Sequence, residues 1–162
     1  SMASGVLRAM GPTSTTTVAP PTLPDTPSLF IAGSTDAVVP VADVTEPAFA
    51  AAQVPTRLWV IDRVGHNGFD DLCTLGGGKG IIGIAEASGL GSFLDAQPAF
   101  RRLGQDGCLP PAVPVRQTFP IIDHAVTAFV RHAFGIDPQP VGLGPAVAGE
   151  YAVPVTIRER LS

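Results

Sequence analysis

Two residues that could form an acid–base pair each follow an apolar run of this chain. Asp36 lies in the segment Gly-Ser-Thr-Asp-Ala-Val-Val-Pro (33–40), and His66 lies in Gly-His-Asn-Gly-Phe (65–69). A carboxylate that accepts the Nδ1–H of an imidazole fixes its tautomer, and the imidazole can then act as a general base. Asp36 and His66 are therefore candidates for two members of a nucleophile–base–acid triad.

The apolar runs themselves predict two buried strands, at residues 28–32 and 56–61. Residues 41–53 between them have the composition of a helix. A strand, a helix and a second strand within ~35 residues form a βαβ unit, which requires parallel strands and a right-handed crossover. The strands then carry Asp36 and His66 to the same edge of the sheet. We therefore expect an α/β fold that is part of a doubly wound, mostly parallel sheet.

The clearest helical pattern covers residues 120–134, where apolar side chains recur on one face. Pro120 suits the first turn of this helix and Gly135 suits its C-cap. His124 and His132 lie near the polar side of the pattern, and we expect both to be solvated.

The segment between the histidine and this helix has a much weaker pattern. Residues 70–118 are predicted to form an irregular insertion or lid, with short helices at 81–87 and 91–103. Residues 138–162 are predicted to be a C-terminal extension. Within it, 151–157 alternates in polarity like an edge strand.

The two cysteines, Cys73 and Cys108, both lie in the insertion and are 35 residues apart. We favour a disulfide over two buried free thiols, because closing this loop would contribute ~3–4 kcal/mol to a segment with little regular structure. A disulfide implies an oxidising compartment, and hence an extracellular or secreted protein. Neither cysteine belongs to a CxxC pair, so we expect no zinc or other metal site.

Composition restricts the classes of partner. The chain has 162 residues, of which 45% are hydrophobic and 15% charged, and its net charge is −4. These values indicate a globular domain with a sizeable core. The acidic balance and a single lysine, Lys79, argue against nucleic acid as a partner. No apolar run approaches the ~18 residues of a membrane span.

Order and spacing together resemble the carboxyl-terminal half of an α/β-hydrolase, most closely the dienelactone-hydrolase-like and polyester- or lipid-ester-hydrolysing branch. In that family a Gly-x-x-Asp-x-x-x-Pro segment carries the triad acid, as in 33–40. A Gly-His segment before an aromatic residue carries the triad histidine, as in 65–69. The family's closing helix is similar to 121–134, and its strand between nucleophile and acid is similar to 5–13. The resemblance implies that residues 1–137 are the carboxyl-terminal portion of such a domain.

The resemblance also implies a carboxylic ester hydrolase with a Ser-His-Asp triad, of the esterase or lipase kind. Asp36 would be its acid and His66 its base. The serine's usual Gly-x-Ser-x-Gly turn does not occur in the chain. We therefore expect a second polypeptide or an N-terminal segment to carry the nucleophile. Lipid, aryl or polyester esters are the expected substrates, with Phe69 and Trp59 as candidate substrate-binding residues. The mechanism needs no cofactor.

Two alternatives remain open at this stage. The missing nucleophile could be a cysteine that acts on lactones, as in dienelactone hydrolases. The chain could instead be a catalytically inactive hydrolase fold that serves as a binding module. Inhibition by thiol alkylation would indicate the first alternative. Function that survives His66→Ala would indicate the second.

Overall fold

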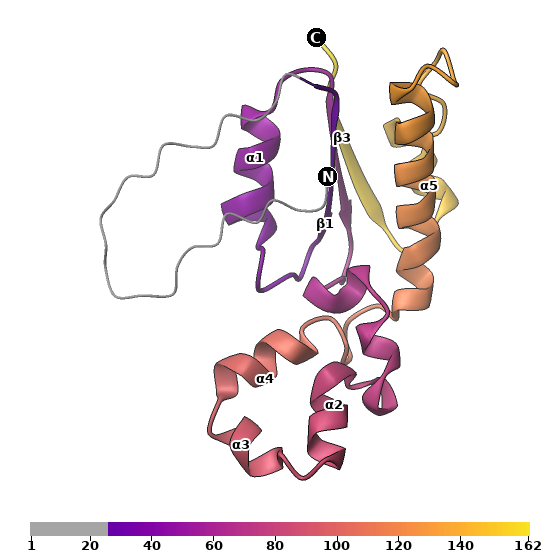
Figure 1. Cartoon of the computed structure of the whole chain (residues 1–162). Coiled ribbons are helices and arrows are strands. Elements are labelled where there is room, and N and C mark those ends of the chain that lie inside the picture. The colour runs from indigo at the N-terminus through magenta and orange to yellow at the C-terminus, as the bar shows by residue number, and fades with distance from the viewer. Residues whose placement is uncertain (1–25) are drawn as a thin grey trace, which may run out of the picture.

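The computed structural model describes residues 26–162, which form a small mixed β-sheet with helices packed on it (Figure 1). The strands are β1 (Ser28–Gly33), β2 (Thr56–Ile61) and β3 (Val155–Arg160), in the order β1-β2-β3. β1 and β2 are parallel, and β3 runs antiparallel to β2. The expected α/β class and parallel strand pair are confirmed, whereas the strand expected within 5–13 lies outside the described residues.

The crossover between β1 and β2 contains a shorter helix than predicted. A π-helical turn at Val41–Thr45 leads into α1 (Glu46–Ala51). Pro47 has no N–H to donate to the preceding turn, so regular α-helical bonding does not extend back through it. The helix ends before Pro55, whose ring disfavours helical backbone in the residue preceding it. The predicted helix over 41–53 is therefore present but irregular at its start.

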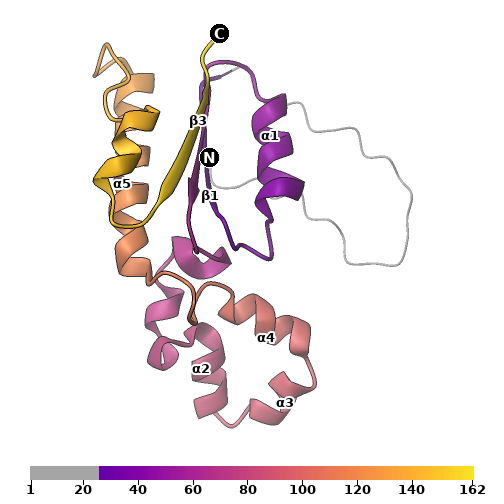
Figure 2. The ribbon, with the colours of Figure 1, turned by 180° about the vertical axis from the view of Figure 1, so that it is seen from behind.

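Both faces of the sheet are covered, with α1 on one side and α5 (Val115–Ala133) on the other (Figures 1 and 2). Successive side chains of a strand point to opposite faces. Leu58 accordingly packs with Phe49 of α1, whereas Trp59 packs with Ile121 of α5. Burial on both faces explains why β2 is apolar along most of its length, with no polar alternation.

α5 begins five residues before the predicted helix, at Val115, and Pro120 lies inside it. The proline therefore removes one backbone hydrogen bond near the start of the helix. The predicted end is confirmed, because Gly135 adopts a positive φ of 71° and the Ile136 amide donates to the Arg131 carbonyl. Among the helices within residues 26–162, none has both the length and the apolar character needed to cross a bilayer.

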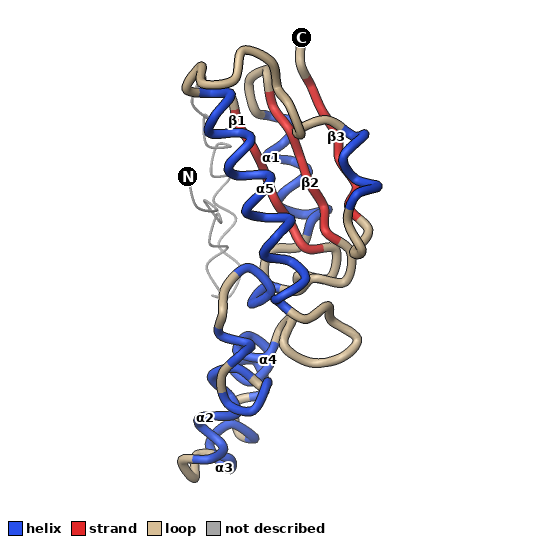
Figure 3. The backbone as a smooth tube through the Cα atoms, turned by 90° about the vertical axis from the view of Figure 1, so that its right-hand side faces the viewer, coloured by secondary structure: helices blue, strands red, loops and turns tan. Residues whose placement is uncertain are grey.

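The insertion forms a group of short helices beyond the carboxyl ends of β1 and β2 (Figures 1 and 3). They are α2 (Gly80–Ala87), α3 (Gly91–Asp95) and α4 (Pro98–Gln105). The single helix predicted over 91–103 is thus two helices. Pro98 explains the break, since the residue before a proline avoids helical backbone.

A disulfide and a group of ion pairs hold the insertion together. Cys73 and Cys108 are bonded, with an S–S distance of 2.08 Å, so the predicted disulfide is confirmed. Glu86 of α2 pairs with Arg101 of α4 and with Lys79. Hydrogen bonds from these two cations, chiefly Arg101, lower the pKa of the Glu86 carboxyl below its ordinary value.

The last strand, β3, covers 155–160 and not the predicted 151–157. Pro154 explains this later start, because it cannot donate to a strand ladder. Arg57 of β2 lies opposite Glu159 of β3, and the two side chains form an ion pair of 2.8 Å. The Arg57 side chain is only 3% exposed, so this pair joins the two strands from inside the protein.

Candidate active site

The loops that follow β1 and β2 lie directly against each other. The Ser34 amide donates to the Ile61 carbonyl over 2.9 Å, and the Thr35 amide donates to the Val64 carbonyl over 3.1 Å. A Cβ atom at Gly33 would lie 2.1 Å from the Val64 carbonyl oxygen, so this close approach requires glycine. The fold thus brings together the two loops that carry Asp36 and His66.

Asp36 and His66 form a hydrogen-bonded pair at this edge of the sheet. The distance between Asp36 Oδ2 and His66 Nδ1 is 3.1 Å. Asp36 Oδ1 accepts the amides of Val38 and Val39, at 2.9 and 2.7 Å. The Asp36 side chain is 7% exposed and that of His66 is 37% exposed. The carboxylate is therefore fixed from both oxygens, and the imidazole is open to solvent on part of its surface.

This arrangement leaves the second ring nitrogen of His66 available. With Nδ1 facing the carboxylate, the proton of a neutral imidazole is favoured at Nδ1 and the lone pair at Nε2. No residue within 26–162 forms a hydrogen bond with Nε2. A group that approaches Nε2 can therefore transfer a proton to it, while Asp36 stabilises the resulting imidazolium.

A second carboxylate, that of Asp106, was not among the predicted site residues and connects both loops to the insertion. Asp106 Oδ2 accepts the backbone amide of His66 at 3.1 Å and that of Ala37 at 2.9 Å. Ala37 directly follows the candidate acid. One carboxylate oxygen thus binds the main chain of both loops of the candidate site.

Asn67 gives the histidine loop a further connection to the insertion. Its side-chain amide donates to the carbonyls of Leu103 and Asp106, at 2.9 and 3.0 Å, and its backbone amide donates to Asp106 O at 2.8 Å. The backbones of Gly65 and Gly107 are also in contact, since a Cβ at Gly65 would lie 2.5 Å from Gly107 N. The His66 loop is therefore packed against residues 103–107 of the insertion.

A sequence signal for Asp106 did exist in the cysteine spacing. Cys73 is seven residues after His66, and Cys108 is two residues after Asp106. A disulfide between these cysteines brings Asp106 close to the histidine loop, whatever the rest of the insertion does. Asn67 is adjacent to His66 but carries no comparable signal, because its partners are carbonyl groups nearly 40 residues away.

The two candidate substrate-binding residues pack on the core in this structure. Trp59 is fully buried, and its ring centroid lies 6.1 Å from that of His124 and 6.2 Å from that of Tyr151. Phe69 is partly buried against the same cluster. Substrate contact by Trp59 or Phe69 therefore stays a prediction.

The expectation that His124 is solvated is wrong, since it is half-buried and hydrogen-bonded to the Tyr151 hydroxyl.

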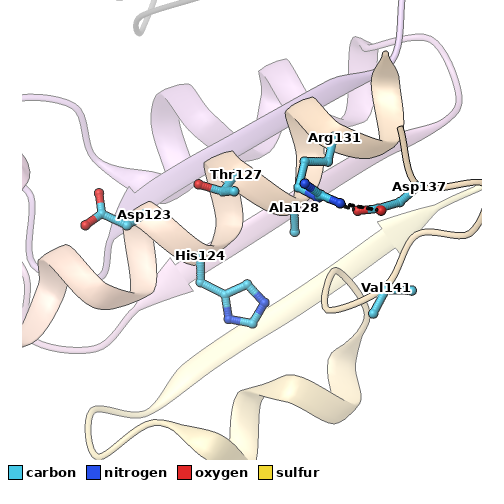
Figure 4. Close-up of a pocket in the computed structure, with 7 residues that line it drawn as sticks. All are labelled: Asp123, His124, Thr127, Ala128, Arg131, Asp137 and Val141. Carbon is cyan, nitrogen blue, oxygen red and sulfur yellow. Dashed lines mark hydrogen bonds and ion pairs between the residues drawn. The ribbon is translucent and has the colours of Figure 1, made fainter. Parts of the chain in front are cut away.

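A separate hollow of about 430 Å³ lies between α5 and the loop after it (Figure 4). Arg131 and Asp137 form a bidentate pair there, at 2.7 and 2.8 Å. The Arg131 guanidinium lowers the pKa of the Asp137 carboxyl. His132 was expected to be solvated but is half-buried, with Nδ1 bonded to the Asp137 carbonyl. Neither Asp36 nor His66 lines this hollow, whose residues are Asp123, His124, Thr127, Ala128, Arg131, Asp137 and Val141.

Within residues 26–162, no three His, Cys, Asp or Glu side chains are grouped so that they could hold a metal ion.

Comparison with family models, curated proteins and solved structures found no match to this chain. The assignment of function therefore rests on the geometry of the site and on the sequence motifs.

Proposed function

We propose that this chain supplies the acid and the base of a serine-dependent carboxylic ester hydrolase of the α/β-hydrolase kind. The nucleophilic serine would lie on a second polypeptide or on an N-terminal segment. The observation that carries the proposal is the 3.1 Å hydrogen bond between Asp36 and His66 at the carboxyl ends of two parallel strands. Open α/β sheets place their chemistry at this edge.

In the proposed reaction, His66 Nε2 takes the proton of the serine hydroxyl as the serine attacks the ester carbonyl. Asp36 accepts the Nδ1–H and stabilises the imidazolium. His66 then protonates the departing alcohol, which leaves an acyl-enzyme. Water activated by the same nitrogen hydrolyses that intermediate and regenerates the serine. Backbone amides of the polypeptide or segment that carries the serine would stabilise the oxyanion.

The layered arrangement supports a larger, doubly wound sheet. Among residues 26–162, β1 pairs only with β2, and helices cover both faces. Further parallel strands would add at the free edge of β1, the strand that leads into the Asp36 loop. In this proposal, the strand that follows the nucleophile pairs with β1 and brings the serine to the same edge of the sheet.

The proposed substrates are lipid, aryl or polyester esters, and the insertion is the proposed lid. Asp106 and Leu103 place the insertion directly against the histidine loop, where a lid would control access to the site. The Cys73–Cys108 disulfide supports an extracellular or secreted location for the enzyme.

Hydrolysis of p-nitrophenyl esters by the purified protein, with its co-purifying polypeptides, tests the proposal. His66→Ala and Asp36→Ala are expected to lower kcat at least about 10³-fold. His132→Ala, a histidine on α5 outside the site, is the matched control and should keep wild-type activity. Inhibition by a thiol-alkylating reagent but not by a phosphonate would replace the serine with a cysteine. Absence of turnover with both short and long acyl chains, in a preparation that contains the segment carrying the nucleophile, would contradict the proposal and favour a binding module.

A further inference from the structure

The insertion contacts the candidate site at a point that involves both of its loops. We call the loop that carries Asp36 the acid loop and the loop that carries His66 the histidine loop. Within the described residues, Asp106 is the side chain that binds the backbones of both loops with one oxygen, through Ala37 N and His66 N. Hydrogen bonds to a charged acceptor are stronger than those between neutral groups. In addition to the direct backbone hydrogen bonds between the two loops, a residue that belongs to neither of them therefore holds their relative position.

Asp106 is itself held in place from the other side. Its main-chain carbonyl accepts the backbone and side-chain amides of Asn67, at 2.8 and 3.0 Å. The next residue, Gly107, has a positive φ of 87° and lies against the backbone of Gly65. The residue after that, Cys108, is tied by the disulfide to Cys73.

We propose that Asp106 is the positioning residue of this site, and that the disulfide-closed insertion serves to hold it there. In this role Asp106 fixes the backbone of His66 relative to that of the acid loop, so that Nδ1 stays within hydrogen-bond distance of Asp36. Asp106 touches no reacting atom in the proposed mechanism. The inference rests on the proposed function only for its catalytic consequence, because the positioning itself is a property of the Asp36–His66 pair.

The main test follows the Nδ1–H proton of His66 by NMR in the full chain. A proton held between imidazole and carboxylate gives a separate low-field signal, and its exchange with water reports how often the bond opens. In Asp106→Ala this exchange should be at least about tenfold faster than in the wild type, as expected when hydrogen bonds to a charged group are lost. Asp36→Ala should abolish the signal and so identifies it.

Two further variants separate positioning from general damage. In Asp106→Asn the carbonyl oxygen can still accept both amides, so the signal should be kept, with exchange between those of wild type and Asp106→Ala. Asp95→Ala removes an exposed carboxylate of the same insertion that pairs with Arg101, and should leave the signal unchanged. Wild-type exchange in folded Asp106→Ala would overturn the inference, as would equal acceleration in Asp95→Ala.

Reduction of the disulfide gives an independent result if Asp106→Ala does not fold. Breaking the Cys73–Cys108 bond in the wild-type chain frees the segment that carries Asp106, so exchange of the His66 proton should again accelerate. Unchanged exchange after complete reduction would overturn the role of the insertion.

Ester hydrolysis measured in parallel distinguishes this inference from the proposed function. If the wild type, together with the segment that carries the nucleophile, hydrolyses no ester while Asp106→Ala still loses the protected proton, the function fails and the positioning role stands. If hydrolysis depends on His66 while Asp106→Ala matches the wild type in rate and in proton exchange, the positioning role fails and the function stands.

Discussion

Replacement of Asp36 by asparagine should reverse the tautomer of His66. Asp36 Oδ1 accepts two backbone amides, from Val38 and Val39. Only the carbonyl oxygen of an asparagine can accept them, because the NH₂ group is a donor. The NH₂ group must then face Nδ1 of His66, which has to become an acceptor. The imidazole proton moves to Nε2, and the lone pair needed by a general base is no longer there.

The structure gives an expected size for each effect. Asp36→Asn keeps the hydrogen bonds from both backbone amides, but their acceptor loses its negative charge. This change should lower the free energy of unfolding by about 1–2 kcal/mol. Asp36→Ala leaves those amides and the imidazole without a partner at a side chain that is 7% exposed. This loss should cost about 3–5 kcal/mol. In the proposed enzyme, the reversed tautomer alone should lower kcat by about 10⁴-fold.

Long-range ¹H–¹⁵N correlation of the imidazole nitrogens distinguishes the two tautomers directly. The wild-type chain should show a protonated Nδ1 and an unprotonated Nε2 at alkaline pH, and Asp36→Asn should show the reverse. Urea titration of the same samples gives the changes in the free energy of unfolding. Retention of the Nδ1–H tautomer in a folded Asp36→Asn chain would refute the reasoning, since it would mean that Asp36 does not set the orientation of the ring.

Three further predictions concern the scaffold. Glu159→Gln leaves Arg57, at 3% exposure, without its anion and should lower the free energy of unfolding in urea by about 2–3 kcal/mol; a change below about 0.5 kcal/mol would mean that the pair behaves like a surface pair. Gly65→Ala places a Cβ 2.5 Å from the backbone of the insertion and should destabilise by about 1–3 kcal/mol, whereas a wild-type melting temperature would contradict this contact. Because Arg131 lowers the pKa of Asp137, this carboxylate stabilises the fold above the ordinary carboxyl pKa, and the contribution is lost as pH falls through the lowered value. Asp137→Asn should therefore melt below the wild type at neutral pH and together with it in strong acid, and an equal difference at both would argue against the pair.

Local sequence patterns predicted the elements that carry the candidate site. The two apolar runs, the helix between them and the polar residues after each strand are all short-range signals, and they place Asp36 and His66 at one edge of a parallel pair. The disulfide followed from the loop that it closes. These predictions succeeded because neighbouring residues determine strand ends and a βαβ crossover limits how the strands pair.

Other features depend on residues that are distant in the sequence. Asp106 joins the site through two backbone amides, a contact that no periodicity records. His124 looked like a solvent-facing helix residue, yet Tyr151 from the C-terminal extension covers it. The helix α5 starts early because Val115 is buried by tertiary packing, which outweighs the signal from Pro120. Each of these errors came from a contact between parts of the chain that local patterns treat separately.

We propose that His66, oriented by Asp36, activates a serine on a second polypeptide or on an N-terminal segment. Treatment of the purified protein with a fluorophosphonate probe, followed by intact-mass measurement of every polypeptide present, tests this most directly. The account predicts one labelled serine, with labelling lost in His66→Ala and kept in His132→Ala. Esterase-active protein that takes up no label, or labelling at the wild-type rate in His66→Ala, would contradict it.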